Sequence, residues 1–137
     1  MSPNRPLIRP TGNHTKPFET AEDLMYVLSD GTTIFIPMRY KTDFASLPWY
    51  LRPFADPYGD DCSAFLIHDW LYTEGGYYTS KEDYDRPNSD EGWIRVNRKF
   101  ADNEMRHRQA LMGSSEWRVR TFYRGVRIGG ASRFNKT

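Results

Sequence analysis

The sequence has 137 residues, 38% of them hydrophobic and 15% aromatic, and a formal net charge of +1. This length provides one domain with a modest core, built around a few large aromatic rings. No apolar run approaches the roughly 20 residues that cross a bilayer, and the single cysteine excludes an internal disulfide or a cysteine-ligated metal cluster. The N-terminal segment lacks the apolar stretch of a secretory signal, so we expect synthesis and folding in a reducing cytoplasm.

The charges are divided unevenly along the chain. Residues 1–97 carry nine Lys/Arg against fifteen Asp/Glu, and residues 98–137 carry ten against three. An acidic body and a basic C-terminal face are therefore expected, and such a face could meet nucleic acid, anionic lipid or an acidic protein neighbour. The alternative is that the two parts lie against each other, so that their opposite charges partly cancel.

The first predicted elements are an extended arm and a hairpin. Residues 1–18 contain four prolines and few apolar residues, which excludes a helix and leaves little to bury. Residues 23–29 and 32–39 flank Asp30-Gly31. An Asp-Gly pair between aromatic and β-branched runs is typical of a β-hairpin.

Two helices are expected next. Ser46 is a good N-cap and Pro48 suits a first turn, so a short helix should follow Ser46. A second helix should run from about Cys62 to Thr73 and stop at Gly75-Gly76.

The remaining chain is predicted as a surface insertion, two further helices and a tail. The insertion is the polar segment 77–91. A long helix should follow over residues 93–112, ended by Gly113. Ser114 or Ser115 then caps a last helix, whose arginines give a basic outer face. Its apolar positions follow a helical stripe and are Val119, Phe122, Tyr123 and Val126. Together these elements predict one α+β domain over residues 19–130, with a small antiparallel sheet packed on about three helices and a tail at 131–137.

His68 is the strongest candidate for chemistry. It follows an apolar run and precedes Asp69, so a buried segment carries polar groups. On a helix, His68 and Tyr72 share a face, while Asp69 points about 100° away. Tyr72 could thus hold the imidazole while Asp69 faces a cation or a backbone amide. An oriented imidazole suits general-base catalysis or metal ligation. The alternative is a buried cluster that only satisfies its own hydrogen bonds.

Two further carboxylates accompany this segment. Asp43 stands between a predicted strand and helix, where it could reach His68 or a shared metal, or simply cap backbone amides. Asp102 lies inside the long helix, where aspartate has poor propensity, so a tertiary partner is expected; the alternative is an exposed pair with Arg106. A metal site here would take Asp69 and Asp43 as ligands, and Ca²⁺ or Zn²⁺ is the cation considered.

Three motifs occur in a recognisable order: TDFASLP at residues 42–48, HDWLY at 68–72 and RKFAD at 98–102. This combination resembles a phage and prophage family catalogued as domain of unknown function 1353, over roughly residues 23–130. The resemblance implies a phage or prophage origin. It implies no particular activity, because the biochemical activity of the family is not settled. The insertion at 77–91 looks longer than usual, and the proline-rich arm looks like an addition.

A second resemblance concerns only the spacing of His68, Asp69 and Tyr72. It is similar to the active-site helix of secreted phospholipases A2, where the His is a general base, the Asp holds Ca²⁺ and a carboxylate on the next long helix orients the His. That resemblance implies an orienting role for Asp102. The disulfide framework and the glycine-rich calcium loop of those enzymes are absent from this sequence.

Two functions of different class follow. The first is a virion or assembly component, tail-associated, that contacts other phage structural proteins. The second is a hydrolase acting on envelope lipid or peptidoglycan, with His68, Asp102 and Tyr72 as its catalytic residues and a cation held by Asp69 and Asp43. Nucleic-acid binding by the basic last helix ranks below both.

Overall fold

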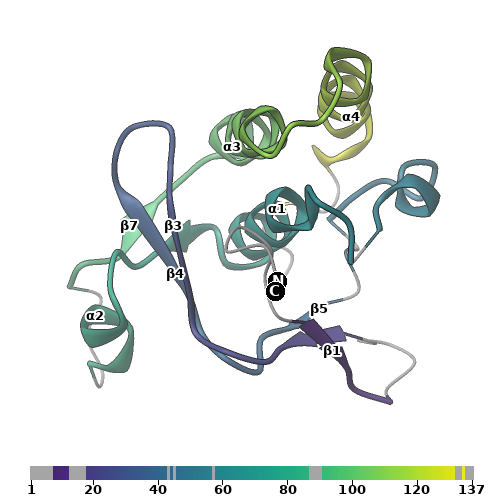
Figure 1. The fold of residues 1–137 in the computed structure, drawn as a ribbon. Coiled ribbons are helices and arrows are strands. Elements are labelled where there is room, and N and C mark those ends of the chain that lie inside the picture. The colour runs from purple at the N-terminus through teal and green to yellow at the C-terminus, as the bar shows by residue number, and fades with distance from the viewer. Residues whose placement is uncertain are drawn as a thin grey trace.

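The computed structural model describes residues 8–12, 18–42, 44, 46–56, 58–86, 91–131 and 134. The fold is α+β, as predicted, with α1 at its centre and α3 and α4 side by side along one side of it (Figure 1). The helical elements are η1 (Arg52–Phe54), α1 (Cys62–Glu74), α2 (Lys81–Asp85), α3 (Arg98–Leu111) and α4 (Glu116–Gly129). The strands are β1 (Ile8–Pro10), β2 (Phe18–Thr20), β3 (Leu24–Val27), β4 (Thr33–Ile36), β5 (Lys41–Thr42), β6 (Gly76–Tyr77) and β7 (Ile94–Arg95).

The described strands form three small antiparallel sheets, ordered β1-β2-β5, β3-β4 and β6-β7. The predicted hairpin is confirmed as β3-β4, with Val27 opposite Thr33. Its turn is closed by Asp30, whose Oδ1 accepts from the amide and the hydroxyl of Thr32, and Gly31 takes a φ of 88° that favours glycine. The pairing of β3 with β4 is therefore set by a short local signal.

Helix α1 is buried on every side. All its residues from Cys62 to Tyr72 are buried, which is the expected place for a helix without a polar face. It ends at Gly75, whose left-handed backbone lets its amide bond to the Leu71 carbonyl at 2.9 Å. The predicted span and stop of this helix are confirmed. One core cluster joins α1 to the β3-β4 hairpin and another joins it to α4.

The starts of two other helices differ from the sequence prediction. The long helix begins at Arg98, after the Asn97 cap, because residues 94 and 95 pair with β6 as a strand instead. The short helix expected after Ser46 is wrong in position: the chain turns there, and a 3₁₀ turn forms only at Arg52–Phe54. The hydroxyl of Ser46 does not cap a helix and instead contacts the imidazole of His68. Ser115 caps α4, as predicted.

The arm and the insertion both contribute strands. β1 lies within the segment expected as an extended arm and pairs with β2, while residues 1–7 and 13–17 lie outside the described residues. The insertion contains α2 and the buried ring of Tyr77, and its residues 87–90 also lie outside the described part. No helix among the described residues is both long and apolar enough to cross a membrane.

Candidate functional site

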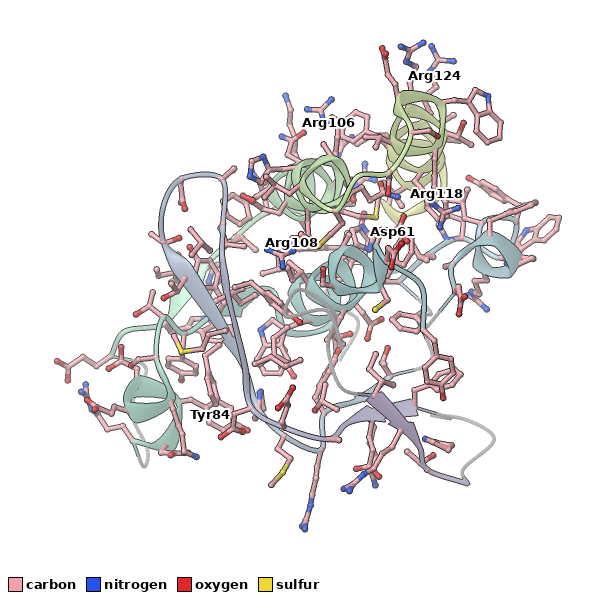
Figure 2. The ribbon with its side chains drawn as sticks, in the orientation of Figure 1. Asp61, Tyr84, Arg106, Arg108, Arg118 and Arg124 are labelled. Carbon is pink, nitrogen blue, oxygen red and sulfur yellow. The ribbon has the colours of Figure 1, made fainter. Side chains whose placement is uncertain are left out.

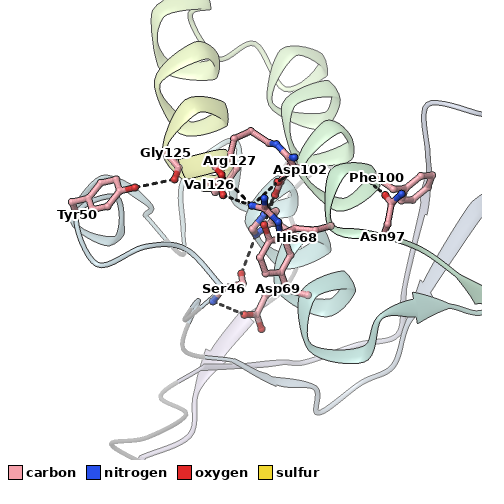
Figure 3. A network of polar contacts seen from close by, with 12 residues as sticks. Ser46, Tyr50, His68, Asp69, Asn97, Phe100, Asp102, Gly125, Val126 and Arg127 are labelled. Atoms are coloured by element: carbon pink, nitrogen blue, oxygen red, sulfur yellow. Dashed lines mark hydrogen bonds and ion pairs between the residues drawn. The ribbon is translucent and has the colours of Figure 1, made fainter. Parts of the chain in front are cut away.

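His68 lies at the middle of α1, completely buried, with both ring nitrogens engaged (Figure 3). Nε2 is 2.8 Å from Asp102 Oδ1, and Nδ1 is 3.0 Å from the Ser46 hydroxyl. The two partners come from α3 and from the turn before η1. The imidazole thus connects three parts of the chain that are remote in sequence.

Asp102 is the anionic centre of this network. Besides His68, its oxygens accept from the Tyr72 hydroxyl at 2.6 Å and from Arg127 Nη1 of α4 at 2.8 Å. Burial raises the pKa of Asp102, but the hydrogen bonds from His68, Tyr72 and Arg127 outweigh burial and leave that pKa below its ordinary value. Asp102 is therefore held ionised. The predicted tertiary partner of this mid-helix aspartate exists, and it is not Arg106, which bonds to Asn103 instead.

The charge of Asp102 determines the tautomer of His68. An ionised carboxylate only accepts hydrogen bonds, so Nε2 must carry a proton and donate a hydrogen bond to Asp102. In the neutral imidazole Nδ1 is then an acceptor, and the Ser46 hydroxyl donates a hydrogen bond to it. The result is an ordered chain of donors that runs from Ser46 through His68 to Asp102.

Tyr72 shares the face of His68, as helical spacing predicted, but it supports the imidazole in a different way. The two rings contact each other, with centroids 4.1 Å apart, and each donates separately to Asp102 Oδ1. Burial, followed by the hydrogen bond to Asp102, raises the pKa of the Tyr72 hydroxyl. Tyr72 is thus a second neutral donor to the carboxylate.

Asp69 faces away from this network, again as its helical position predicted. Its side chain is 2% exposed. Oδ2 accepts from the hydroxyls of Tyr40 at 2.7 Å and Thr42 at 2.6 Å, and Oδ1 accepts from the Ser46 amide at 3.4 Å. Asp69 therefore fastens the chain around β5 to α1.

The metal hypothesis rested on Asp69 and Asp43. Asp43 lies outside the described residues. A cation at Asp69 would have to displace donors that already point at both of its oxygens. In the part of the chain that the structure describes, no group of three or more His, Cys, Asp or Glu residues could hold a metal ion.

Five members of these networks were not expected as site residues: Tyr40, Thr42, Ser46, Arg127 and Arg98, whose guanidinium lies 3.8 Å from Asp102. Thr42 and Ser46 belong to the TDFASLP motif, so the motif itself was the signal that could have identified them. Arg127 carries no such signal, because its position on α4 is that of an ordinary solvated arginine.

Comparison with known proteins assigns the chain to a family. No curated protein and no solved structure matches it. A family model described as protein of unknown function, DUF1353, matches residues 18–126 and so includes all three motifs, with Ser46, His68 and Asp102 among the matched residues. Since that match spans most of its length, the chain belongs to the DUF1353 family.

Proposed function

We propose that this protein is a noncatalytic component of a bacteriophage particle or of its assembly, in which the His68–Asp102 network holds the helices together. The observation that carries the proposal is the closure of the network. His68 and Asp102 are each 0% exposed, and both imidazole nitrogens are engaged by protein groups. A general base must come within hydrogen-bond reach of the proton that it removes, and this imidazole has no free nitrogen to offer.

The distribution of charge supports a role in assembly. The exposed side of α3 and α4 carries arginines with no buried partner, and Figure 2 shows Arg106 and Arg124 extending outward from these helices. Arg106 also lies over the ring of Tyr123, with its guanidinium carbon 4.0 Å from the ring centroid. An exposed basic surface of this kind suits a subunit that contacts an acidic neighbour in a particle.

The test is the protein composition of purified particles. Particles from a strain that carries this gene are separated on a density gradient, and quantitative mass spectrometry measures the copy number of the protein relative to the major capsid protein. We expect a constant ratio across the particle band for the wild type, and a lower ratio for the double variant Arg106→Glu/Arg124→Glu. Complete absence of the wild-type protein from particles and from assembly intermediates contradicts the proposal.

One observation favours a second candidate, an envelope hydrolase. The donor chain from Ser46 through His68 to Asp102 has the proton order of a nucleophile, a base and an orienting acid. Ser46 is 5% exposed, so a substrate would reach it only after the turn around it moved. The test is turnover of phospholipid vesicles and muropeptides by the purified chain, with and without Ca²⁺ or Zn²⁺. Turnover that disappears in both Ser46→Ala and His68→Ala would establish this candidate and reject the noncatalytic one.

A further inference from the structure

An open cleft of about 610 Å³ is lined in part by Tyr40, the residue whose hydroxyl donates to Asp69. Its walls come from the turn between β4 and β5, the C-terminal end of α1, and the segment from β6 to β7. Five aromatic side chains line it: Tyr40, Trp70, Tyr78, Tyr84 and Trp93. Tyr84 lies between α2 and the β3-β4 hairpin (Figure 2), where its ring contacts Phe35. The insertion at residues 77–91 thus supplies part of the cleft.

The rings of the cleft are held in place by the protein. The Tyr40 hydroxyl donates to Asp69, and Trp70 Nε1 donates to the Gly76 carbonyl at 3.0 Å. Trp93 lies against Gly76, where a Cβ would be 2.7 Å from the indole ring. Tyr40 packs edge to face against Trp70 with ring centroids 5.0 Å apart, and Tyr78 packs in the same way against Trp93 with centroids 4.8 Å apart. Such fixed rings lose little conformational entropy when a ligand binds.

Charged groups of both signs line the same cleft: Glu74, Arg39 and Lys41. None of the three forms an ion pair with another described residue, and the Glu74 carboxylate also has no hydrogen bond there. Burial, and then the charge of Asp69, raises the pKa of Glu74. The cleft therefore offers a carboxylate acceptor and two cationic donors with no partner of their own in the described chain.

We propose that this cleft binds a saccharide. The apolar face of a sugar ring packs against flat aromatic side chains, while its hydroxyls both donate and accept and so can use Glu74 and the two cations together. Glu74 attracts a cationic ligand that Arg39 and Lys41 repel, and it repels a phosphate that those two cations attract. This mixture of charges favours a neutral ligand with many hydroxyls over a cationic or a phosphate-bearing one. This proposal goes beyond the role in a particle and does not depend on it, because particle composition and ligand binding are measured separately.

The test is calorimetric titration of the full chain. The probes are the tetramers of N-acetylglucosamine, β-linked glucose and α-linked glucose, together with an array of bacterial surface glycans and, for comparison, oligothymidylate. We expect saturable binding of at least one saccharide. Trp93→Ala should weaken it roughly tenfold or more, as truncation of a central aromatic contact does, and Glu74→Gln should weaken it severalfold. Two matched controls, Trp117→Ala on α4 and Glu82→Gln on α2, should leave binding unchanged, because both side chains are exposed away from the cleft lining.

Three outcomes overturn the proposal. The first is that no saccharide binds at concentrations up to about 10 mM, since weaker binding than this is not that of a specific site. The second is that neither cleft variant changes saccharide binding, and the third is that oligothymidylate binds in the cleft and no saccharide does. Trp93→Ala removes packing against Gly76, so its thermal midpoint must be measured alongside. Glu74→Gln keeps the size of a partly exposed side chain that has no described partner, so that variant keeps the test decisive if Trp93→Ala does not fold.

Discussion

His68 and Asp69 are neighbours on α1, yet they belong to two regions that differ in their access to solvent. On the His68 side, a carboxylate, an imidazole and a phenol satisfy one another inside the core, and the partly exposed guanidinium of Arg127 covers the carboxylate from outside (Figure 3). On the Asp69 side, the carboxylate fastens the Tyr40 wall of a cleft that is open to solvent. The more concentrated polar chemistry is therefore closed, and the open region is built mainly of aromatic rings.

This difference shows why a cluster of titratable residues is a weak sign of a reactive site. A buried carboxylate needs several donors simply to remain charged in the core, so a dense network forms wherever such a carboxylate is kept. Access to solvent distinguishes a reactive site from a network that only keeps a buried carboxylate charged. The same helix can thus place one polar side chain in a closed network and the next beside the wall of an open cleft.

Asp102→Asn is expected to give the largest effect, since it removes the charge that Arg127, His68 and Tyr72 share. Breaking a buried charged network by changing one partner costs about 3–5 kcal/mol. Urea denaturation should show a loss of that order in the free energy of unfolding. Asp85→Asn is the matched control: it removes only an exposed pair with Lys81, 3.2 Å apart, and should cost less than about 1 kcal/mol. Equal losses in the two variants would contradict a structural role for the network.

Asp69→Asn is expected to cost less, about 1–3 kcal/mol, because one oxygen remains to accept from the donors around it. The substitution should also change the electrostatics of the cleft, since the charge of Asp69 contributes to the raised pKa of Glu74. A carboxyl titration followed by NMR should therefore give a lower Glu74 pKa in this variant. In Asp102→Asn the Glu74 pKa should be unchanged. A shift of the same size in both variants would mean that the two regions are not separate.

The elements that were correctly predicted depend on local signals. The β3-β4 hairpin follows from Asp30-Gly31, and the end of α1 follows from Gly75 after a continuous apolar run. The start of α3 was misplaced because β7 exists only by pairing with β6, about eighteen residues earlier in the chain. A pairing between remote short strands leaves no periodic pattern in either strand.

The candidate site was foreseen in part for the same reason. Helical spacing alone placed Tyr72 beside His68 and Asp69 on another face. Poor helix propensity singled out Asp102, and only its orienting role came from resemblance. Arg127 could not be foreseen, because a long side chain on a basic helix face can turn back to a buried carboxylate without changing the helical pattern. The cleft was also missed: its rings come from three separate segments that only the tertiary fold brings together.

At acid pH, the wild type and Asp102→Asn should differ less in their free energy of unfolding. The pKa of Asp102 is lower in the folded protein than its ordinary value of 3.8, so its contribution to stability is complete above that value and is lost as the pH falls through the folded pKa. Asp61 is shifted in the same direction: burial raises its pKa, and hydrogen bonds from Arg118 and Ser114 more than reverse that. Its contribution is lost alike in both proteins. Urea midpoints measured from neutral pH into acid should converge; a constant gap would contradict an ionised Asp102.

Ser46→Ala is expected to give the smallest effect, near the lower end of the roughly 1–3 kcal/mol that an unsatisfied buried acceptor costs, because neither the lost donor nor the acceptor is charged. The variant removes the donor to His68 Nδ1 but leaves the Ser46 backbone amide in place for Asp69. Because the charge of Asp102 fixes the tautomer, the ¹⁵N shifts of His68 should still show the proton on Nε2. A change of tautomer in Ser46→Ala would mean that Ser46, and not Asp102, orders the chain of donors.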